Sequence, residues 1–175
     1  LKGEIIFRSY GIKKFLYLKN PNFKKRLFYL YKAFKISKNI KTIKQFCKIN
    51  RRKFFLANNI KIAIKLNLDG VYIPSFNKKN EINYYNKKRN FIVLGSAHNL
   101  KEIRIKEKQK VNCIFLSPIF YVKKSKKSLG IQKFNFLSNY TKKKIICLGG
   151  LNKKNMKKIK LLNIYGIASI SLFKK

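Results

Sequence analysis

The sequence predicts an α/β fold of the TIM (βα)8 barrel class. Short apolar runs rich in β-branched and aromatic residues alternate with longer lysine-rich segments of helical period, as in βα units around a parallel sheet. Three of the apolar runs end in small or polar residues, at Ser96-Ala97-His98, Ser117-Pro118 and Gly149-Gly150. Because the active site of such a barrel lies at the carboxyl ends of its strands, these three segments form the candidate site.

Seven segments are expected to be strands, because each is a short apolar run bounded by turn-forming or charged residues. In chain order they are Glu4–Phe7, Lys53–Leu56, Gly70–Ile73, Phe91–Leu94, Cys113–Leu116, Ile145–Leu148 and Gly166–Ile170. Seven parallel strands are one short of a closed barrel and would leave an unpaired edge. Since the chain begins with Leu1 rather than Met, we expect that the first strand is lacking from this chain.

Six segments between the strands are expected to be helices, because their apolar residues recur every three or four positions. They are Phe23–Lys48, Ile60–Leu66, Lys79–Lys87, Leu100–Lys108, Lys133–Tyr140 and Lys153–Leu161. The first is too long for one crossover helix, and the polar residues Ser37-Lys38-Asn39 suggest a break in it. The other long connection, residues 117–130, is rich in Lys and Ser, which favours a mobile loop that closes over an anion.

Composition favours a single globular domain over residues 1–175, because 46% hydrophobic residues suffice for a core. The formal net charge of +39 would ordinarily suggest a nucleic acid or an anionic membrane as partner. However, nearly all of the 44 basic residues are lysines spread along the whole chain. Arginine is the better reader of base edges and phosphates, so a nucleic-acid partner is disfavoured. An RNA-associated basic protein remains a remote alternative.

The three cysteines predict a reducing compartment. Cys47, Cys113 and Cys147 show no CxxC spacing, and two of them lie inside apolar strand-like runs, so we expect buried free thiols. No apolar run reaches the ~18 to 20 residues that a membrane span needs, and no secretory signal is visible. We therefore expect a cytoplasmic protein without a membrane partner. The sequence leaves the oligomeric state open.

The motifs resemble those of the thiamine phosphate synthase and TenI (thiazole tautomerase) superfamily of phosphate-binding barrels. Ser96-Ala97-His98 resembles the family's Ser-Ala-His motif after strand five. Ile6-Phe7-Arg8 resembles the family's strand with a diphosphate-binding arginine, and Leu68-Asp69-Gly70-Val71-Tyr72 resembles its Ala-Asp-Gly-Val-His segment. Leu116-Ser117-Pro118-Ile119-Phe120 resembles its Gly-Pro-Val/Ile-Phe motif, and Leu148-Gly149-Gly150-Leu151 resembles its Ile-Gly-Gly-Ile turn. Ala168-Ser169-Ile170-Ser171 resembles the phosphate-binding end of the family's strand eight. The resemblance extends from Glu4 to Phe173.

Gly149 and Gly150 lie between a buried strand and an expected helix, where glycines let backbone N–H groups approach a phosphate. Together with Ile170 and Ser171 at the last strand tip, they would form the phosphate site that barrels build after strands seven and eight. The alternative is a plain turn that needs small residues for packing.

His98 is the only histidine, and it follows a strand and opens a helix, so its imidazole is expected to face the barrel mouth. The resemblance implies that a histidine at this position transfers protons in tautomerase members. It also implies that the neighbouring serine, Ser96, helps to hold a diphosphate in synthases. We therefore predict His98 and Ser96 as catalytic residues; the alternative is an ordinary polar residue with a satisfied side chain.

The resemblance implies a transferase reaction in which a hydroxymethylpyrimidine diphosphate joins a thiazole phosphate and releases pyrophosphate. Arg8, Asn58, Lys124 and Lys126 are the predicted diphosphate-binding residues, with a solvated lysine-rich loop as the alternative for the two lysines. The remaining alternatives are a TenI-like thiazole tautomerase and a non-catalytic protein that binds thiazole phosphate or thiamine phosphate. Whether the chain is an enzyme at all stays open.

The resemblance also implies Mg²⁺, but the carboxylates that hold it in the family are missing here. Asn58-Asn59 stands where the family has Asn-Asp, and Ile73-Pro74-Ser75-Phe76 replaces Gly-Gln-x-Asp. Only five acidic residues occur in the whole chain. Magnesium is therefore expected from the resemblance but in question for this chain, and no metal-ligating residue is assigned.

Overall fold

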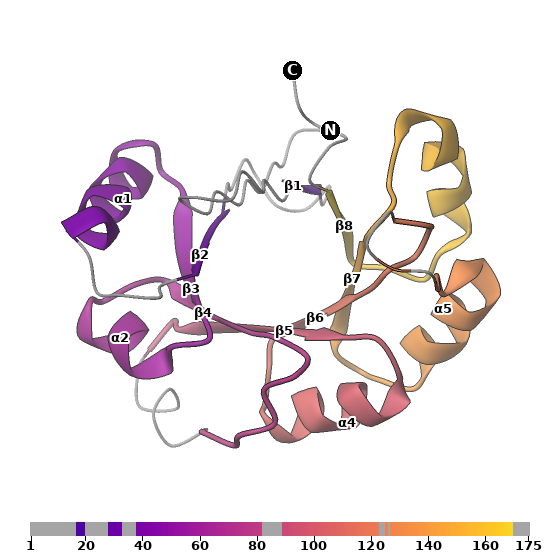
Figure 1. The fold of residues 1–175 in the computed structure, drawn as a ribbon, viewed down its shortest axis with the longest axis horizontal. Helices are drawn as coiled ribbons and strands as arrows, with labels where there is room; N and C mark the ends of the chain where they lie inside the picture. Colours follow the sequence, from indigo (N-terminus) through magenta and orange to yellow (C-terminus); the bar gives the residue numbers. More distant parts are fainter. Residues whose placement is uncertain are drawn as a thin grey trace.

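A computed structural model describes residues 17–19, 28–32, 38–81, 89–122, 125 and 127–169. Strands and helices alternate along the chain, and the strands form one curled sheet with the helices on its outer side (Figure 1). The strands are β1 (Tyr17–Lys19), β2 (Phe28–Lys32), β3 (Lys53–Ala57), β4 (Gly70–Ile73), β5 (Ile92–Ala97), β6 (Cys113–Leu116), β7 (Lys144–Leu148) and β8 (Gly166–Ser169). The helices are α1 (Lys38–Ile49), α2 (Ile60–Lys65), α4 (Leu100–Lys108), α5 (Gly130–Asn139) and η1 (Lys153–Leu161).

The strand order in the sheet is β1-β8-β7-β6-β5-β4-β3-β2. From β2 to β8, each strand pairs in parallel with its neighbour in sequence, whereas β1 pairs with β8 in the antiparallel direction. Sequential parallel strands with helices on the convex side form the wall of a TIM-like barrel. The predicted α/β class is therefore confirmed.

One predicted helix is wrong at residues 28–32. The segment Phe23–Lys48 contains β2, and α1 begins only at Lys38, where the polar residues suggested a break. Most residues of β2 are aromatic and favour strands. Phe28–Lys32 pairs with all five residues of β3, and this pairing stabilises the segment as a strand rather than a helix. Six of the seven predicted strands are present, two with the expected ends and four with ends that differ by one to three residues. The seventh, Glu4–Phe7, lies outside the described residues.

The lysine-rich segment Lys153–Leu161 is a 3₁₀ helix rather than an α-helix. Asn152 and Asn155 form a capping box at its start, each side chain accepting from the other residue's backbone N–H. None of its residues is buried, and Met156 and Ile159 pack against the core as half-buried residues. The predicted helix Lys79–Lys87 is not helical at residues 79–81, and the remainder of it lies outside the described residues.

Two apolar clusters cover the two faces of the sheet. The larger one contains helix residues such as Ile40, Ala63 and Ile103, so it fills the space between the sheet and the outer helices. The smaller one consists of strand residues alone and lies on the concave face: Phe55, Leu94, Phe115, Ile146 and Ala168. Because side chains alternate along a strand, this inner cluster shows which residues of each strand face the barrel interior.

All three cysteines are free thiols, as predicted, and burial is the main influence on their acidity. Burial raises the pKa of Cys47 and Cys147 to about 12 and that of half-buried Cys113 to about 11. Because the thiolate is the nucleophile, we expect slow alkylation of the native protein by iodoacetamide at pH 8 and fast alkylation in urea. Mass spectrometry would count the modified thiols. Three rapidly alkylated thiols in the native state would contradict the burial.

Candidate functional site

Ser96 and Tyr72 face the barrel interior near the carboxyl ends of β5 and β4. Ser96 lies two residues after Leu94 of the inner cluster and is only 4% exposed. The Tyr72 ring contacts Phe115 edge-on, with 5.9 Å between centroids. Burial raises the pKa of Tyr72, and a hydrogen bond with the Ser96 side chain offsets part of that rise. One hydroxyl hydrogen is used in the bond between the two side chains, which leaves one hydroxyl hydrogen of the pair for another acceptor.

His98 lies against the carboxyl end of the next strand, β6. Its Nδ1 is 2.6 Å from the carbonyl oxygen of Ser117 and 3.4 Å from the Ser117 hydroxyl. Since a carbonyl oxygen can only accept a hydrogen bond, Nδ1 must carry a proton. In the neutral ring, Nε2 then has the free lone pair, and the His98 side chain is exposed. This tautomer suits the acceptance of a proton from a bound molecule.

The start of α4 fixes the backbone of His98. The His98 N–H donates to Glu102 Oε2 at 2.7 Å, and Asn99 Oδ1 accepts from the Glu102 N–H at 2.9 Å. Asn99 also donates from Nδ2 to Glu102 Oε1 at 3.2 Å. An Asn followed three residues later by Glu is a capping pattern visible in the sequence. It determines where α4 begins and hence where the imidazole lies.

Gly149 and Gly150 follow β7 and have positive φ angles of 98° and 71°. A Cβ on Gly149 would lie 2.7 Å from Pro118 Cβ, and one on Gly150 would lie 2.6 Å from the Phe120 carbonyl group. The loops after β6 and β7 are joined by bonds from Ile119 N to Leu148 O (3.0 Å) and from Phe120 N to Gly149 O (3.2 Å). Packing of one loop on the other is thus sufficient reason for both glycines.

The proposed phosphate site is described only in part. Ile170 and Ser171, its other predicted members, lie outside the described residues, and so do Arg8, Lys124 and Lys126 of the diphosphate site. The loop over residues 117–130 is hydrogen-bonded at its base, because Leu129 N donates to Pro118 O at 2.9 Å and Gly130 N donates to Ile119 O at 3.0 Å.

Asn58 lies at the carboxyl end of β3 in a left-handed conformation, with φ of 57°. Its N–H donates to Tyr72 O at 2.7 Å, and its Oδ1 accepts from Asn77 Nδ2 at 2.7 Å. Asn58 is therefore fixed against the end of β4, next to Tyr72. Asparagine is one of the few residues that adopt this conformation readily.

A magnesium ion held by protein carboxylates does not fit the described residues. Asn59, in the place of the family's aspartate, caps α2 by accepting from Ile62 N at 3.0 Å. Phe76, in the place of the second aspartate, is apolar and 72% exposed. Within the described part of the chain, no group of three or more His, Cys, Asp or Glu side chains could hold a metal ion.

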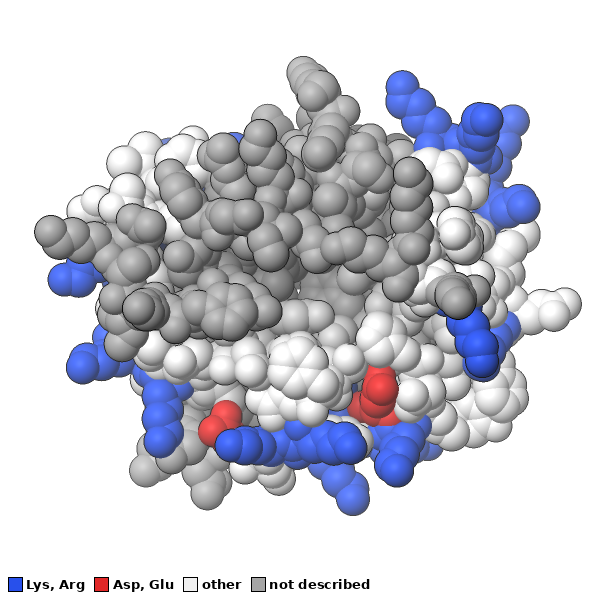
Figure 2. Space-filling model, in the orientation of Figure 1, with Lys and Arg blue, Asp and Glu red and all other residues white. Residues whose placement is uncertain are grey.

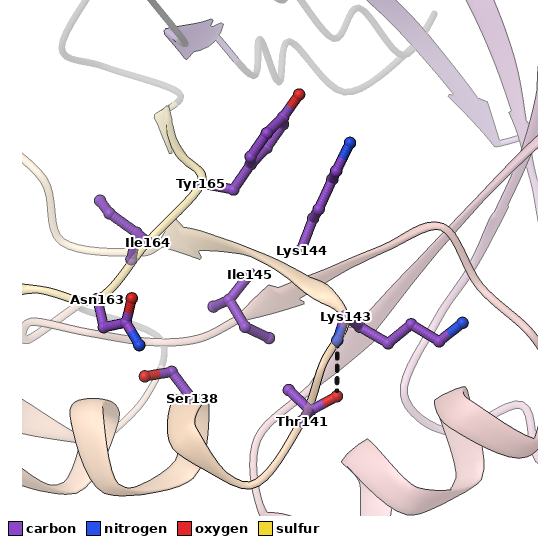
Figure 3. A pocket seen from close by; sticks show the side chains of 8 residues that line it. All are labelled: Ser138, Thr141, Lys143, Lys144, Ile145, Asn163, Ile164 and Tyr165. Atoms are coloured by element: carbon purple, nitrogen blue, oxygen red, sulfur yellow. Dashed lines mark hydrogen bonds between the residues drawn. The ribbon is translucent and has the colours of Figure 1, made fainter.

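A cavity of about 300 Å³ lies at the opposite end of the sheet, near the amino-terminal ends of β7 and β8 (Figure 3). Lys144 Nζ lies 4.6 Å from the Tyr165 ring centroid, and Thr141 Oγ1 accepts from Lys143 N at 3.1 Å. The remaining lining residues are Ser138, Ile145, Asn163 and Ile164. Because barrel active sites lie at the carboxyl ends of strands, this cavity is separate from the candidate site.

Basic side chains lie around the rim of the molecule in Figure 2, including a group at the upper right over η1. Those visible on this face lie over several outer elements, interrupted by acidic side chains at the lower edge. A nucleic-acid site usually gathers its positive charge in one continuous stripe.

Among the described residues, no helix is both long and apolar enough to cross a bilayer.

Comparison with known proteins places these features in context. A family model described as thiamine monophosphate synthase matches residues 30–173. The thiamine-phosphate synthase of Prochlorococcus marinus is 30% identical over 138 residues, which cover 75% of this chain and 38% of that protein. The putative thiamine-phosphate synthase 2 of Aquifex aeolicus is 31% identical over 114 residues, which cover 64% and 61%. The chain thus spans 38% to 61% of the length of these two relatives.

Solved structures show the same fold. The thiamine phosphate pyrophosphorylase from Pyrococcus furiosus has a TM-score of 0.64 at 18% identity, over 82% of this chain and 71% of that one. FabK from Thermotoga maritima has a TM-score of 0.59 at 14% identity, over 79% of this chain and 49% of that one. At these identities, the similarity concerns the barrel fold alone.

Proposed function

The chain belongs to the thiamine monophosphate synthase family, and we propose that it acts in thiamine biosynthesis by joining a hydroxymethylpyrimidine diphosphate to a thiazole phosphate. The observation that carries the proposal is the arrangement of Tyr72, Ser96 and His98 at adjacent strand ends. The hydroxyl pair has one hydrogen left to donate to an anion, and the exposed imidazole can transfer a proton. Two relatives named as thiamine-phosphate synthases support the same reaction.

In the proposed reaction, the bond from the pyrimidine's methylene carbon to the diphosphate oxygen breaks, and the thiazole nitrogen forms a bond to that carbon. The departing pyrophosphate gains negative charge, which must be stabilised. The proposed diphosphate ligands are the Ser96 hydroxyl, the Asn58 side chain and the basic residues Arg8, Lys124 and Lys126. The thiazole phosphate is assigned to Gly149, Gly150, Ile170 and Ser171. Magnesium is not assigned to any of these residues.

The finer description of the fold belongs to the same proposal. We assign the chain to a single (βα)8 barrel domain over residues 1–175, and we place the protein in the cytoplasm. Sequential parallel pairing from β2 to β8 supports the barrel wall. Buried free thiols support a reducing compartment.

A second candidate is thiazole tautomerisation, and the geometry of His98 favours it. With the proton on Nδ1 held by Ser117 O, Nε2 can remove a proton from a bound thiazole and return it elsewhere on the ring. This reaction needs no diphosphate site and no metal ion. It is therefore compatible with the missing carboxylates.

Incubating the purified protein with both substrates, with and without Mg²⁺, tests the proposal. We expect thiamine phosphate and pyrophosphate to form in equal amounts. Isomerisation of the thiazole without coupling would select the tautomerase, and binding of thiazole phosphate without turnover would select a non-catalytic role.

Replacing Ser96 tests the diphosphate end of the site. Ser96→Ala removes a hydroxyl bonded to Tyr72 and placed for a charged oxygen, and such a bond contributes about 1.5 to 3 kcal/mol. We expect the KM for the pyrimidine diphosphate to rise by about tenfold or more. Ser138→Ala is the matched control, because Ser138 is also 4% exposed but lies on α5 near the opposite end of the barrel. An equal effect of both variants would exclude a specific role for Ser96.

A further inference from the structure

Lys106 on α4 is buried, with 0% of its surface exposed. Its Nζ donates to Pro74 O at 2.8 Å, to Asn77 O at 2.8 Å and to Gln109 Oε1 at 2.9 Å. An ammonium group has three hydrogens, so these three acceptors match its donors in number. Burying a lysine is costly, and an apolar side chain would fill the same space at lower cost. The contacts that it makes therefore require an explanation other than stability.

Gly95 in β5 provides the room for this lysine. A Cβ on Gly95 would lie 2.9 Å from Lys106 Cδ and 3.1 Å from Val111 Cγ1. A glycine inside a strand weakens the strand and often marks a close approach of another group. The side chain of Lys106 thus passes over β5 at Gly95 and reaches the loop that follows β4.

That loop connects Lys106 to the candidate site. Asn77 O accepts from Lys106 Nζ and from Gln109 Nε2, the latter at 3.0 Å. The side chain of Asn77 contacts the candidate site, because its Nδ2 donates to Asn58 Oδ1 at 2.7 Å. Gln109 Nε2 also donates to Lys79 O at 2.7 Å. Two buried side chains, Lys106 on α4 and Gln109 at its C-cap, therefore hold the backbone from which Asn77 contacts Asn58.

We propose that Lys106 is a positioning residue, which fixes Asn58 at the diphosphate end of the site by holding the loop 74–79 through the Asn77 carbonyl. The assignment of Asn58 to the diphosphate rests on the proposed function. The contacts from Lys106 to Asn58 do not depend on it, so the two claims can fail separately.

The first test measures binding of inorganic pyrophosphate by calorimetry. Lys106→Met keeps most of the side-chain length but removes the donors, and we expect about tenfold weaker binding. Lys108→Met is the matched control, because Lys108 lies on the same helix and is exposed. Its affinity is expected to equal that of the wild type. Unchanged binding by the Lys106 variant would overturn the proposal.

A double-mutant cycle tests the route through Asn77. Asn77→Ala removes the donor to Asn58, and we expect it to weaken binding by about tenfold as well. If Lys106 acts through Asn77, the double variant Lys106→Met, Asn77→Ala should lose about tenfold rather than about a hundredfold. Losses that multiply would show that the two residues act independently and would contradict the proposal.

The pH dependence distinguishes positioning from simple packing. Burial lowers the pKa of Lys106 to about 8, and Glu102, one turn earlier on α4, partly offsets this. The loop contributes only carbonyl groups to Nζ, and these do not titrate. Above this pH, Nζ has lost its positive charge and has two hydrogens for three acceptors, so its hold on the loop carbonyls weakens. We expect pyrophosphate affinity relative to Lys106→Met to fall as pH rises through about 8.

Carbon NMR separates the outcomes. The Asn77 carbonyl resonance should titrate with a midpoint near pH 8 in the wild type and not in Lys106→Met. If the Asn77 carbonyl of the wild type titrates near pH 8 but the protein does not bind pyrophosphate, the proposed function is wrong. The contact of Lys106 with the loop 74–79 is then still supported. If the resonance does not titrate, the positioning role fails. Should Lys106→Met not fold, Gln109→Met removes the other donor to the same carbonyl and replaces it in the binding test.

Discussion

Replacing His98 with alanine is expected to lower kcat for thiazole tautomerisation by about 100-fold or more while leaving the fold intact. A positioned acid or base contributes about 10² to 10⁴ in rate, and His98 is the only histidine of the chain. Its exposed side chain makes one short hydrogen bond, to Ser117 O, whose loss costs about 1 kcal/mol of unfolding free energy. Steady-state kinetics and urea denaturation of the same preparation measure the two effects.

His98→Asn is the matched control for this result. The asparagine Nδ2 can replace Nδ1 as the donor to Ser117 O, but it offers no equivalent of Nε2 as a base. We therefore expect the asparagine variant to be as slow as the alanine variant in the proton-transfer reaction. Recovery of activity in His98→Asn would show that the histidine only orders the loops.

Gly150→Ala is expected to lower the free energy of unfolding by about 3 kcal/mol. The positive φ of 71° costs a non-glycine residue about 1 to 2 kcal/mol. The added Cβ would also lie 2.6 Å from the carbonyl groups of Phe120 and Tyr121, which are backbone atoms and cannot turn away. The clash would separate the loops after β6 and β7.

Gly130→Ala separates the cost of the positive φ from the cost of the Cβ clash. Gly130 has a similar φ of 68°, but nothing lies within 4 Å of the Cβ position. We expect this variant to lose only the conformational part, about 1 to 2 kcal/mol, in the same urea denaturation experiment. Equal losses for the two variants would mean that packing between the loops contributes nothing at Gly150.

Six strands were predictable because each is a short apolar run whose features are local. β2 was not, since Leu27-Phe-Tyr-Leu-Tyr31 in a lysine-rich segment can be interpreted as part of a helix. Its strand form depends on pairing with β3. Similarly, alternation along β4 could have identified Tyr72 as an inward-facing residue next to Gly70. The bond of Tyr72 to Ser96, however, depends on β4 and β5 being neighbours.

The sequence by itself determined the barrel class, the strand ends that carry Ser96, His98 and Gly149-Gly150, and the family, because periodicity and turn chemistry are encoded in neighbouring residues. The tertiary structure decided which side chains act together. Lys106 and Asn77 are 29 positions apart, and they meet because β4 and β5 are neighbours in the sheet and because β5 has a glycine where the lysine passes. Such contacts depend on strand order and on free space, which no local pattern specifies.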